Sequence, residues 1–200
     1  MDKGETYTIP TYFGDGKYAV SILENVNGSK YTVKLSVNIT VKSDSLYQTF
    51  LNSTRQADFE ASPDAAAKAK ELTANCKTTA EKINVIYNWV YDNIKYDKKF
   101  VDNTYPNDPC DPFDLDEILE NGKGVCRHRA AVTAGMLRSI GIPCRTACSN
   151  SNNHAWIQVW YETGTSKKNG VTYSEGAWIQ LDTTSRSYAS YAASKIATLA

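Results

Sequence analysis

The sequence predicts a fold that mixes α-helices and β-strands, and three observations predict it. Residues 17–25 and 30–42 alternate apolar and polar side chains, as strands with one buried face do. Four segments between residues 63 and 140 instead have helical spacing of apolar residues or helix-forming composition. Residues 154–161 and 177–182 return to strict alternation, so strands flank a central run of helices.

Length and composition favour one main domain. The 200 residues are enough for one hydrophobic core and a small appendage, and a hydrophobic share of 42% is ordinary for a soluble globular protein. The 22 lysines and arginines equal the 22 aspartates and glutamates, so the charge gives no reason to expect nucleic acid as a partner. No apolar run reaches the roughly 18 to 20 residues that span a bilayer, so we expect no membrane span.

The N-terminal strands are expected to form a hairpin. Asn27–Gly28 lies between them, and this pair tolerates the positive φ of a tight turn. The second strand carries apolar residues at alternate positions, namely Tyr31, Val33, Leu35, Val37, Ile39 and Val41. The pattern changes between residues 50 and 62. We therefore expect an N-terminal β segment at residues 1–55 and a main domain at residues 56–200.

Four helices are expected in the main domain. The first follows Ser62 and runs to about Asn75, and a capping box at Thr78 and Glu81 starts the second. The third covers residues 114–120 and ends at an Asn-Gly pair, after a loop that contains three prolines. The fourth starts near Cys126 and stops at a glycine, so Cys126 lies at or beside its first turn.

The two C-terminal strands are expected to pair as an antiparallel hairpin. The polar segment 162–176 is the predicted connecting loop. Pairing centred on Lys168 places opposite each other His154 and Asp182, Trp156 and Gln180, and Gln158 and Trp178. Opposed residues have Cβ atoms roughly 4.5 to 5.5 Å apart, so the Asp182 carboxylate would accept a hydrogen bond from the His154 imidazole.

Cys126, His154 and Asp182 are the predicted catalytic residues. An aspartate bound to a histidine fixes the tautomer of the ring and stabilises its imidazolium. A thiol has a pKa of about 8.5, and a helix N-terminus or a neighbouring imidazolium lowers that pKa. The helix start also offers backbone N–H groups to an anion that develops on an attacked carbonyl oxygen. The three residues therefore predict a cysteine nucleophile, a base and an orienting acid.

Three blocks of the sequence resemble the transglutaminase-like superfamily, in particular its bacterial members. They are G-K-G-V-C-R-H-R-A-A with M-L-R-S-I-G-I-P-C-R after it, N-H-A-W-I-Q-V-W, and G-A-W-I-Q-L-D-T-T. The resemblance covers roughly residues 79–185. It implies an α+β fold with a papain-type core, in which the nucleophile helix packs on an antiparallel β-sheet beside a small N-terminal β hairpin. It also implies that Cys126 is the nucleophile, His154 the base and then the acid, and Asp182 the orienting residue.

The sequence departs from the family pattern in two places. Arg127, His128 and Arg129 follow the nucleophile, where the family often has an acidic residue and an aromatic one. Gln158 stands where the family often has a carboxylate. The two arginines would favour an acidic substrate or simply lie on the helix surface. His128 points about 200° away from Cys126, so we expect a surface group or a substrate contact rather than the base.

Substrate-binding residues are predicted beside the triad. The family usually draws its second oxyanion donor from an upstream side chain, for which Tyr96 is the candidate. Trp156, Trp160 and Trp178 share the predicted face of His154. We expect them to pack around the site, and the alternative is that one of them, with Trp156 and Trp178 as candidates, stacks on the substrate.

The five cysteines are an odd number. With Cys126 as a free thiol, Cys76, Cys110, Cys144 and Cys148 would make up to two disulfides, which would suit a secreted protein. No second cysteine pair with metal-ligand spacing accompanies Cys144 and Cys148, so we expect no zinc site. The predicted mechanism requires no metal and no cofactor.

The expected function is acyl transfer on a peptide or side-chain amide through a thioester, with a protein or peptide as substrate. Hydrolysis by a protease or amidase is favoured over cross-linking. The alternative is a non-catalytic or weakly active cell-surface or cell-wall binding module that uses the hairpin and exposed aromatic residues. We expect an extracellular or cell-surface location, although Met1 is followed by Asp2 and Lys3 rather than by a signal sequence. The oligomeric state is left open.

Overall fold

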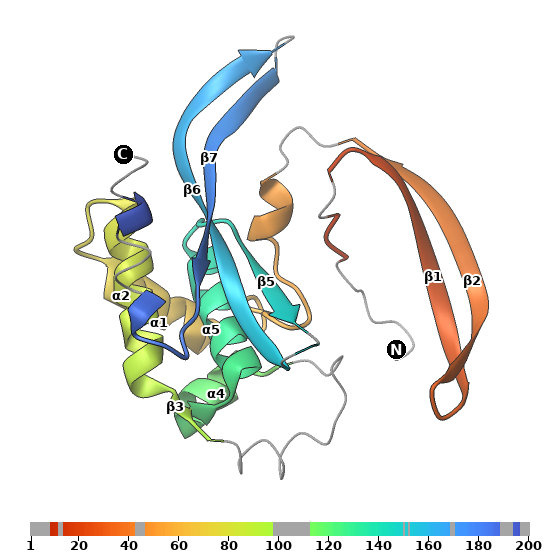
Figure 1. Ribbon diagram of the computed structural model, residues 1–200, viewed down its shortest axis with the longest axis horizontal. Coiled ribbons are helices and arrows are strands. Elements are labelled where there is room, and N and C mark those ends of the chain that lie inside the picture. The colour runs from red at the N-terminus through yellow and green to blue at the C-terminus, as the bar shows by residue number, and fades with distance from the viewer. Residues whose placement is uncertain are drawn as a thin grey trace.

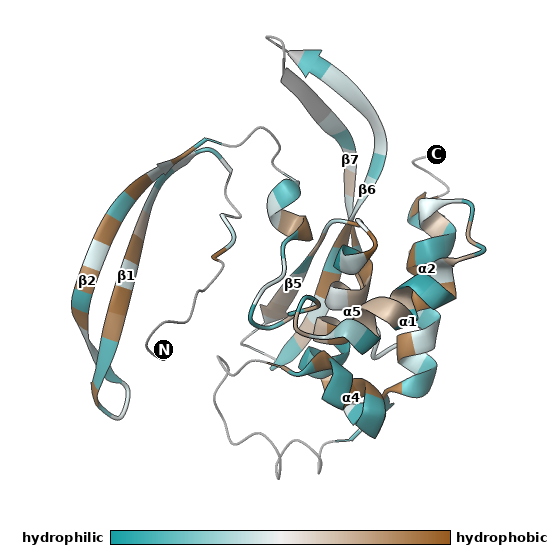
Figure 2. Ribbon diagram, turned by 180° about the vertical axis from the view of Figure 1, so that it is seen from behind, coloured by the Kyte–Doolittle hydropathy of each residue, from teal (hydrophilic) through white to brown (hydrophobic). Residues whose placement is uncertain are grey.

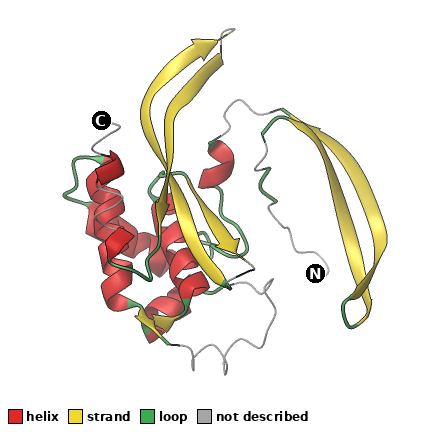
Figure 3. Cartoon of the chain, in the orientation of Figure 1, coloured by secondary structure: helices red, strands yellow, loops and turns green. Residues whose placement is uncertain are grey.

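Three groups of elements form the structure: an N-terminal hairpin, a group of helices and a three-stranded sheet (Figures 1 and 3). The computed structural model describes residues 9–11, 14–42, 47–97, 113–149, 151, 153–168, 171–188 and 194–196. In chain order the elements are β1 (Gly16–Asn27), β2 (Lys30–Val41), the 3-10 helix η1 (Gln48–Leu51), α1 (Pro63–Thr73), α2 (Thr79–Asn93), β3 (Lys95–Tyr96), α4 (Leu115–Asn121), β4 (Lys123–Gly124), α5 (Cys126–Ser139), β5 (Cys144–Ser149), β6 (His154–Lys168) and β7 (Val171–Leu181). The predicted mixture of helices and strands is confirmed.

The β1–β2 hairpin confirms the predicted strand pair and its turn. Gly28 has a φ of 55°, which glycine adopts without steric cost. The register places six apolar residues on one face, in the pairs Tyr18–Ile39, Val20–Val37 and Ile22–Leu35. This face is open to solvent, because Ile22, Leu35, Val37 and Ile39 are between 40% and 52% exposed. The hairpin stands apart from the helices and the three-stranded sheet, and hydrophobic and hydrophilic bands alternate along it (Figure 2).

The segment after the hairpin packs on the main domain. Phe50 of η1 is 2% exposed and meets Trp178 of β7 edge to face, with ring centroids 4.8 Å apart. Arg138 of α5 donates hydrogen bonds to Asn52 O and Thr54 Oγ1, at 3.3 and 3.1 Å. The division into residues 1–55 and 56–200 stays a prediction, and these contacts join residues on both sides of it.

Local signals start and end the helices as predicted. At the start of α2, the Glu81 N–H donates to Thr78 Oγ1 and the Thr78 N–H donates to Glu81 Oε2, both at 3.2 Å. Asp114 caps α4 by accepting hydrogen bonds from two backbone N–H groups of its first turn. Gly122, with a φ of 59°, ends α4 in the left-handed conformation. These contacts involve neighbours in sequence, which is why the sequence predicts them.

Helix α5 occupies the centre of the main domain. It packs against α1, α2 and α4, and also against β5 and β6 (Figure 1). Every residue of α5 except Arg127 and Ser139 is buried. Gly135 allows α4 to approach, since a Cβ at Gly135 would lie 2.4 Å from Leu115 Cδ1. A helix that is buried on all sides must satisfy its polar side chains inside the protein.

The sheet has the strand order β5-β6-β7, and both of its strand pairs are antiparallel. One face of the sheet joins the apolar core that includes α5, through Cys144, Ile157, Val159, Ile179 and Leu181. The other face carries His154, Trp156, Gln158 and Trp160 of β6, because side chains alternate along a strand. Helix α5, which begins with Cys126, therefore packs on an antiparallel sheet, as expected.

The predicted register between the C-terminal strands is wrong by two residues. Gln158 pairs with Gln180 and Trp160 pairs with Trp178. The segment 162–176, predicted as a loop, belongs to the strands, and pairing continues out to Lys168 opposite Val171. A register shift between Glu162 and Gly164 separates these outer pairs, which differ from the predicted register by three residues, from the inner pairs, which differ by two. Because an offset of two residues preserves the alternation, every side chain stays on its predicted face.

Candidate active site

Cys126 is the first residue of α5 and is 7% exposed. The short parallel pair of β3 and β4 lies directly before it. In this pair the Lys95 N–H donates to Gly122 O at 2.8 Å, and the Asp97 N–H donates to Gly124 O at 3.0 Å. The pairing places Tyr96 opposite Gly124, two residues before Cys126. A connection between the end of α2 and the start of α5 thus brings Tyr96 to the thiol.

Tyr96 lies beside Cys126 and is 47% exposed. Partial burial raises the pKa of the Tyr96 phenol, and the neighbouring Cys126 thiol raises that pKa further. The phenol therefore keeps its proton at neutral pH and is able to donate a hydrogen bond beside the thiol. The structure brings this predicted substrate-binding residue next to the predicted nucleophile.

His154 and Asp182 are joined by a hydrogen bond of 2.7 Å between His154 Nε2 and Asp182 Oδ2. The other carboxylate oxygen, Oδ1, accepts hydrogen bonds from the backbone N–H of Thr184 at 2.9 Å and from Thr184 Oγ1 at 2.6 Å. Asp182 is only 7% exposed. Thr184 thus holds the carboxylate in the orientation that receives the imidazole, a contact that the sequence analysis missed.

The two residues meet although they are not directly opposed. Ile157 pairs with Leu181, so Asp182, which directly follows β7, lies next to Trp156 and diagonal to His154. Diagonal neighbours on one sheet face are still within reach of long side chains. The expected contact is present, but the direct opposition from which it was inferred is wrong.

The Cys126 thiol makes no hydrogen bond to the His154 ring, although both residues belong to the described part of the chain. Catalytic hydrogen bonds are often long before substrate binds. His154 Nε2 is engaged by Asp182, which leaves Nδ1 as the ring nitrogen able to receive a proton. The site therefore has two halves, Cys126 with Tyr96 and His154 with Asp182.

Arg129 connects these two halves. It is 4% exposed and donates hydrogen bonds to three backbone carbonyls: from Nε to Ile94 O at 2.6 Å, from Nη2 to Tyr91 O at 2.8 Å, and from Nη1 to Thr183 O. Arg129 belongs to the first turn of α5, and Thr183 directly follows Asp182. Because this arginine is buried, the expectation that it lies on the helix surface is wrong.

His128 is buried, so the prediction of a surface group is wrong. It has no exposed surface, and its ring lies 4.7 Å from the ring of Phe113. The Val125 N–H donates to His128 Nδ1 at 3.3 Å, so the ring caps the start of its own helix. Burial, and then the charge of Arg127, lower the pKa of His128 to about 4. The many small residues of α5, such as Ala130, Ala131 and Ala134, were the available sign that the helix is enclosed.

A family comparison identifies the fold. The family model described as the transglutaminase-like superfamily matches residues 66–183. The chain belongs to this superfamily. The matched segment contains Cys126, His154 and Asp182, and it runs from α1 to just beyond β7. The α+β fold class and the family resemblance found in the sequence are therefore confirmed.

Several crystal structures are similar to this superfamily member. A candidate cysteine protease from Cytophaga hutchinsonii is 14% identical, with a TM-score of 0.48 over 84% of this chain and 65% of that chain. The periplasmic domain of TgpA from Pseudomonas aeruginosa is 18% identical, with a TM-score of 0.46 over 76% and 50%. A candidate protease from Parabacteroides distasonis is 17% identical, with a TM-score of 0.41 over 86% and 42%. The chain thus spans between 42% and 65% of these proteins. A search of curated proteins found no match.

An aromatic cluster covers the His154 face of the sheet farther along β6. Trp160 stacks on Tyr47 with ring centroids 4.3 Å apart, and Trp178 meets Trp160 at 5.4 Å. The Trp156 ring lies 6.0 Å from the His154 ring, and its indole N–H is enclosed without an acceptor among the described residues. Trp160 and Trp178 thus pack within this cluster. Substrate binding by Trp156 and Trp178 stays a prediction.

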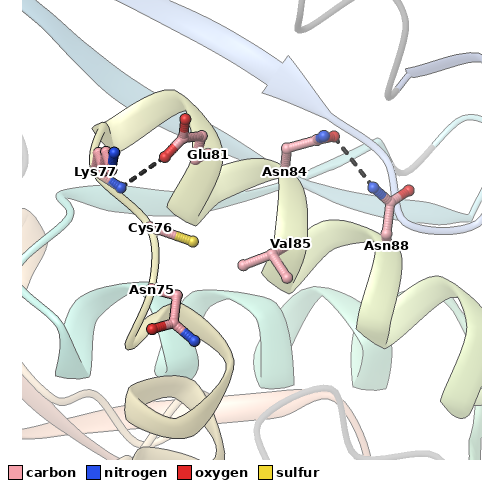
Figure 4. Close-up of a pocket in the computed structure, with 7 residues that line it drawn as sticks. All are labelled: Asn75, Cys76, Lys77, Glu81, Asn84, Val85 and Asn88. Carbon is pink, nitrogen blue, oxygen red and sulfur yellow. Dashed lines mark hydrogen bonds between the residues drawn. The ribbon is translucent and has the colours of Figure 1, made fainter.

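A pocket is formed by α2 and the residues directly before it (Figure 4). It is lined by Asn75, Cys76, Lys77, Glu81, Asn84, Val85 and Asn88. None of the predicted site residues contributes to it.

The described cysteines are all free thiols: Cys76, Cys126, Cys144 and Cys148. The disulfides considered above are therefore not formed by Cys76, Cys144 or Cys148, while Cys110 lies outside the described residues. Burial raises the pKa of the Cys144 thiol. Among the described helices, none is long and apolar enough to cross a membrane.

Proposed function

We propose that this member of the transglutaminase-like superfamily is a cysteine enzyme that acts on peptide or side-chain amides through a thioester. The observation that carries the proposal is the 2.7 Å hydrogen bond between His154 and Asp182, in a chain that places Cys126 at the start of α5. A buried carboxylate that receives an imidazole is the arrangement of a general base and its orienting group.

The proposed reaction begins with transfer of the Cys126 proton to His154 Nδ1. The thiolate attacks the amide carbonyl carbon, and the oxyanion that forms accepts hydrogen bonds from the N–H groups at the start of α5 and from the Tyr96 hydroxyl. The C–N bond then breaks, and the amine leaves with the proton from His154. Asp182 stabilises the imidazolium throughout. A thioester between the acyl group and Cys126 remains.

Water or a second amine then resolves the thioester, with His154 removing the proton of the attacking group. We favour water, which makes the enzyme a protease or amidase rather than a cross-linking transferase. The outcome depends on which nucleophile reaches the thioester. Incubation with dansyl-cadaverine and a glutamine-containing protein distinguishes them, because a transferase incorporates the amine while a hydrolase releases ammonia or peptide fragments.

Alkylation of the thiols tests the proposed nucleophile. We expect iodoacetamide at neutral pH to label Cys126 faster than Cys148, although Cys148 is exposed and Cys126 is buried. His154→Ala should remove this advantage, because no imidazole then accepts the thiol proton and no imidazolium stabilises the thiolate. Equal or slower labelling of Cys126 in the unmodified protein would contradict the proposal. That result would instead favour the alternative, a cell-surface or cell-wall binding module on the same fold.

The proposed location is extracellular or on the cell surface. Fractionation of the source cells with an antibody against the chain tests it, and recovery in the cytoplasm alone would contradict it.

A further inference from the structure

Arg145 of β5 lies on the same sheet face as His154. It is directly opposed to Gln158, and Ser149 is directly opposed to His154, so the two pairs are four residues apart along the strands. Ala147 and Trp156 form the pair between them. All six residues are partly exposed. We call these three residue pairs the β5–β6 strip.

Two aromatic rings and one hydrogen bond hold the Arg145 guanidinium in place. Its Cζ lies 4.3 Å above the ring of Trp178, and the ring of Phe50 is 6.0 Å away. Arg145 Nε donates to Gln158 Oε1 at 2.8 Å. Stacking and one hydrogen bond fix the planar group, so little further conformational entropy is lost when it binds a ligand.

The charge of Arg145 has no carboxylate partner within the described structure. Its hydrogen-bond partner Gln158 is neutral. Two carboxylates belong to the same sheet face, but both are engaged elsewhere: Asp182 by His154 and Glu162 by Ser174 Oγ. The two Nη groups of Arg145 have no acceptor among the described residues. A fixed, partly exposed guanidinium with both Nη groups available suits bidentate binding of a carboxylate.

We propose that Arg145 binds a carboxylate of the substrate, so that the enzyme prefers acidic peptides. The inference rests on the proposed function, because it assumes that a peptide reacts beside His154. Strands rise about 3.3 Å per residue, which places Arg145 about 13 Å along the sheet from His154. An extended peptide on the β5–β6 strip would therefore carry its carboxylate about four residues from the reacting amide.

Peptide binding to the Cys126→Ala chain tests this site without any turnover. One fluorescent peptide has glutamate four residues before a central glutamine, a second has glutamate four residues after it, and each has a twin with glutamine in place of glutamate. In a third pair, the peptide ends four residues after the central glutamine, in a free C-terminal carboxylate in one member and in a C-terminal amide in the other. This pair shows whether Arg145 binds a terminal carboxylate rather than a side-chain carboxylate. We expect at least one acidic peptide to bind about tenfold more tightly than its twin at low salt, because a charge-assisted hydrogen bond replaces a neutral one.

Two variants and a control assign the preference to Arg145. Arg145→Gln should bring the affinity of the acidic peptide close to that of its glutamine twin, so that the ratio of the two affinities is close to one. Gln158→Glu should do the same with Arg145 and its stacking intact, because the new carboxylate would occupy the guanidinium. Lys167→Gln removes a positive charge from an exposed position of β6 outside the β5–β6 strip, and it should leave the ratio unchanged.

The proposal is overturned if each acidic peptide binds no more tightly than its twin. It is equally overturned if Arg145→Gln and Gln158→Glu both preserve the preference. The binding measurement is independent of the thiol, so slow alkylation of Cys126 would contradict the proposed chemistry without affecting this result.

Discussion

Arg129 donates a hydrogen bond to the backbone carbonyl of Thr183, the residue directly after Asp182. The same guanidinium binds Ile94 O, two residues before Tyr96. One buried side chain in the first turn of α5 is therefore bonded to the segments that carry Tyr96 and Asp182.

Replacement of Arg129 should destabilise the protein strongly. Arg129→Met leaves three backbone carbonyls without their donors, and two of them, those of Ile94 and Thr183, are buried. We expect a loss of about 3 kcal/mol in the free energy of unfolding, at about 1 kcal/mol for each. Urea unfolding measures the loss. Arg127→Met is the matched control, because its guanidinium is partly exposed and lies 5.5 Å above the Phe113 ring. Similar losses in the two variants would contradict the connecting role of Arg129.

Asp182→Asn should slow alkylation of Cys126 at least tenfold at neutral pH. An amide does not stabilise the imidazolium as a carboxylate does, so less thiolate forms. Thr184→Val removes only one hydrogen bond from Asp182 and should have a smaller effect. The rate of iodoacetamide labelling in each variant provides the comparison. A rate in Asp182→Asn equal to that of the unmodified chain would show that the carboxylate does not act on the thiol.

Acid should destabilise the protein through His128. Its pKa of about 4 in the folded state lies below the ordinary value of 6.5, so the unfolded chain binds more protons between these pH values. Stability is then fully present above pH 6.5 and falls as the pH drops toward 4. The shift corresponds to about 3 kcal/mol. Urea unfolding of the unmodified chain and of His128→Gln from pH 7.5 to 4 isolates this contribution. Curves that stay parallel would contradict it.

Gly124→Ala should displace the start of α5. A Cβ at Gly124 would lie 2.6 Å from the Cβ of His128, which does not move without its backbone. We expect a loss of about 1 to 3 kcal/mol, typical of an overpacked site, and slower alkylation of Cys126. Gly164→Ala is the control, since a Cβ there meets nothing within 4 Å. A melting temperature unchanged in Gly124→Ala would mean that the helix start tolerates movement.

Sequence patterns predicted the features that depend on close neighbours. The capping box at Thr78 and Glu81 and the glycine that ends α4 are examples, because each joins residues within one helical turn. The extent of the β6–β7 hairpin was not predictable in this way. Residues 162–176 are largely polar, so they lack the alternation of apolar residues that identifies a strand with one buried face.

In the candidate site, too, some features were predictable from the sequence and others were not. Cys126, His154 and Asp182 were found from their spacing and the family resemblance, whereas the partners of Arg129 lie 35 to 54 residues away in sequence. No periodicity encodes such contacts. The burial of His128 depends likewise on Phe113 and on the enclosure of α5 by elements on all sides.

The long β6–β7 hairpin has a practical consequence for anyone who wishes to attach another molecule to the protein. The strand pairs from Ile157–Leu181 to Trp160–Trp178 fix the side of the sheet on which His154 lies, and pairing continues well beyond them to Lys168 and Val171. A peptide tag or a small domain inserted between Lys168 and Val171 would leave those inner pairs in place. Deletion of a single residue from β6 between His154 and Ile157, by contrast, would turn the imidazole to the opposite side of the sheet. The outer end of the hairpin is thus a suitable tether for immobilising the protein.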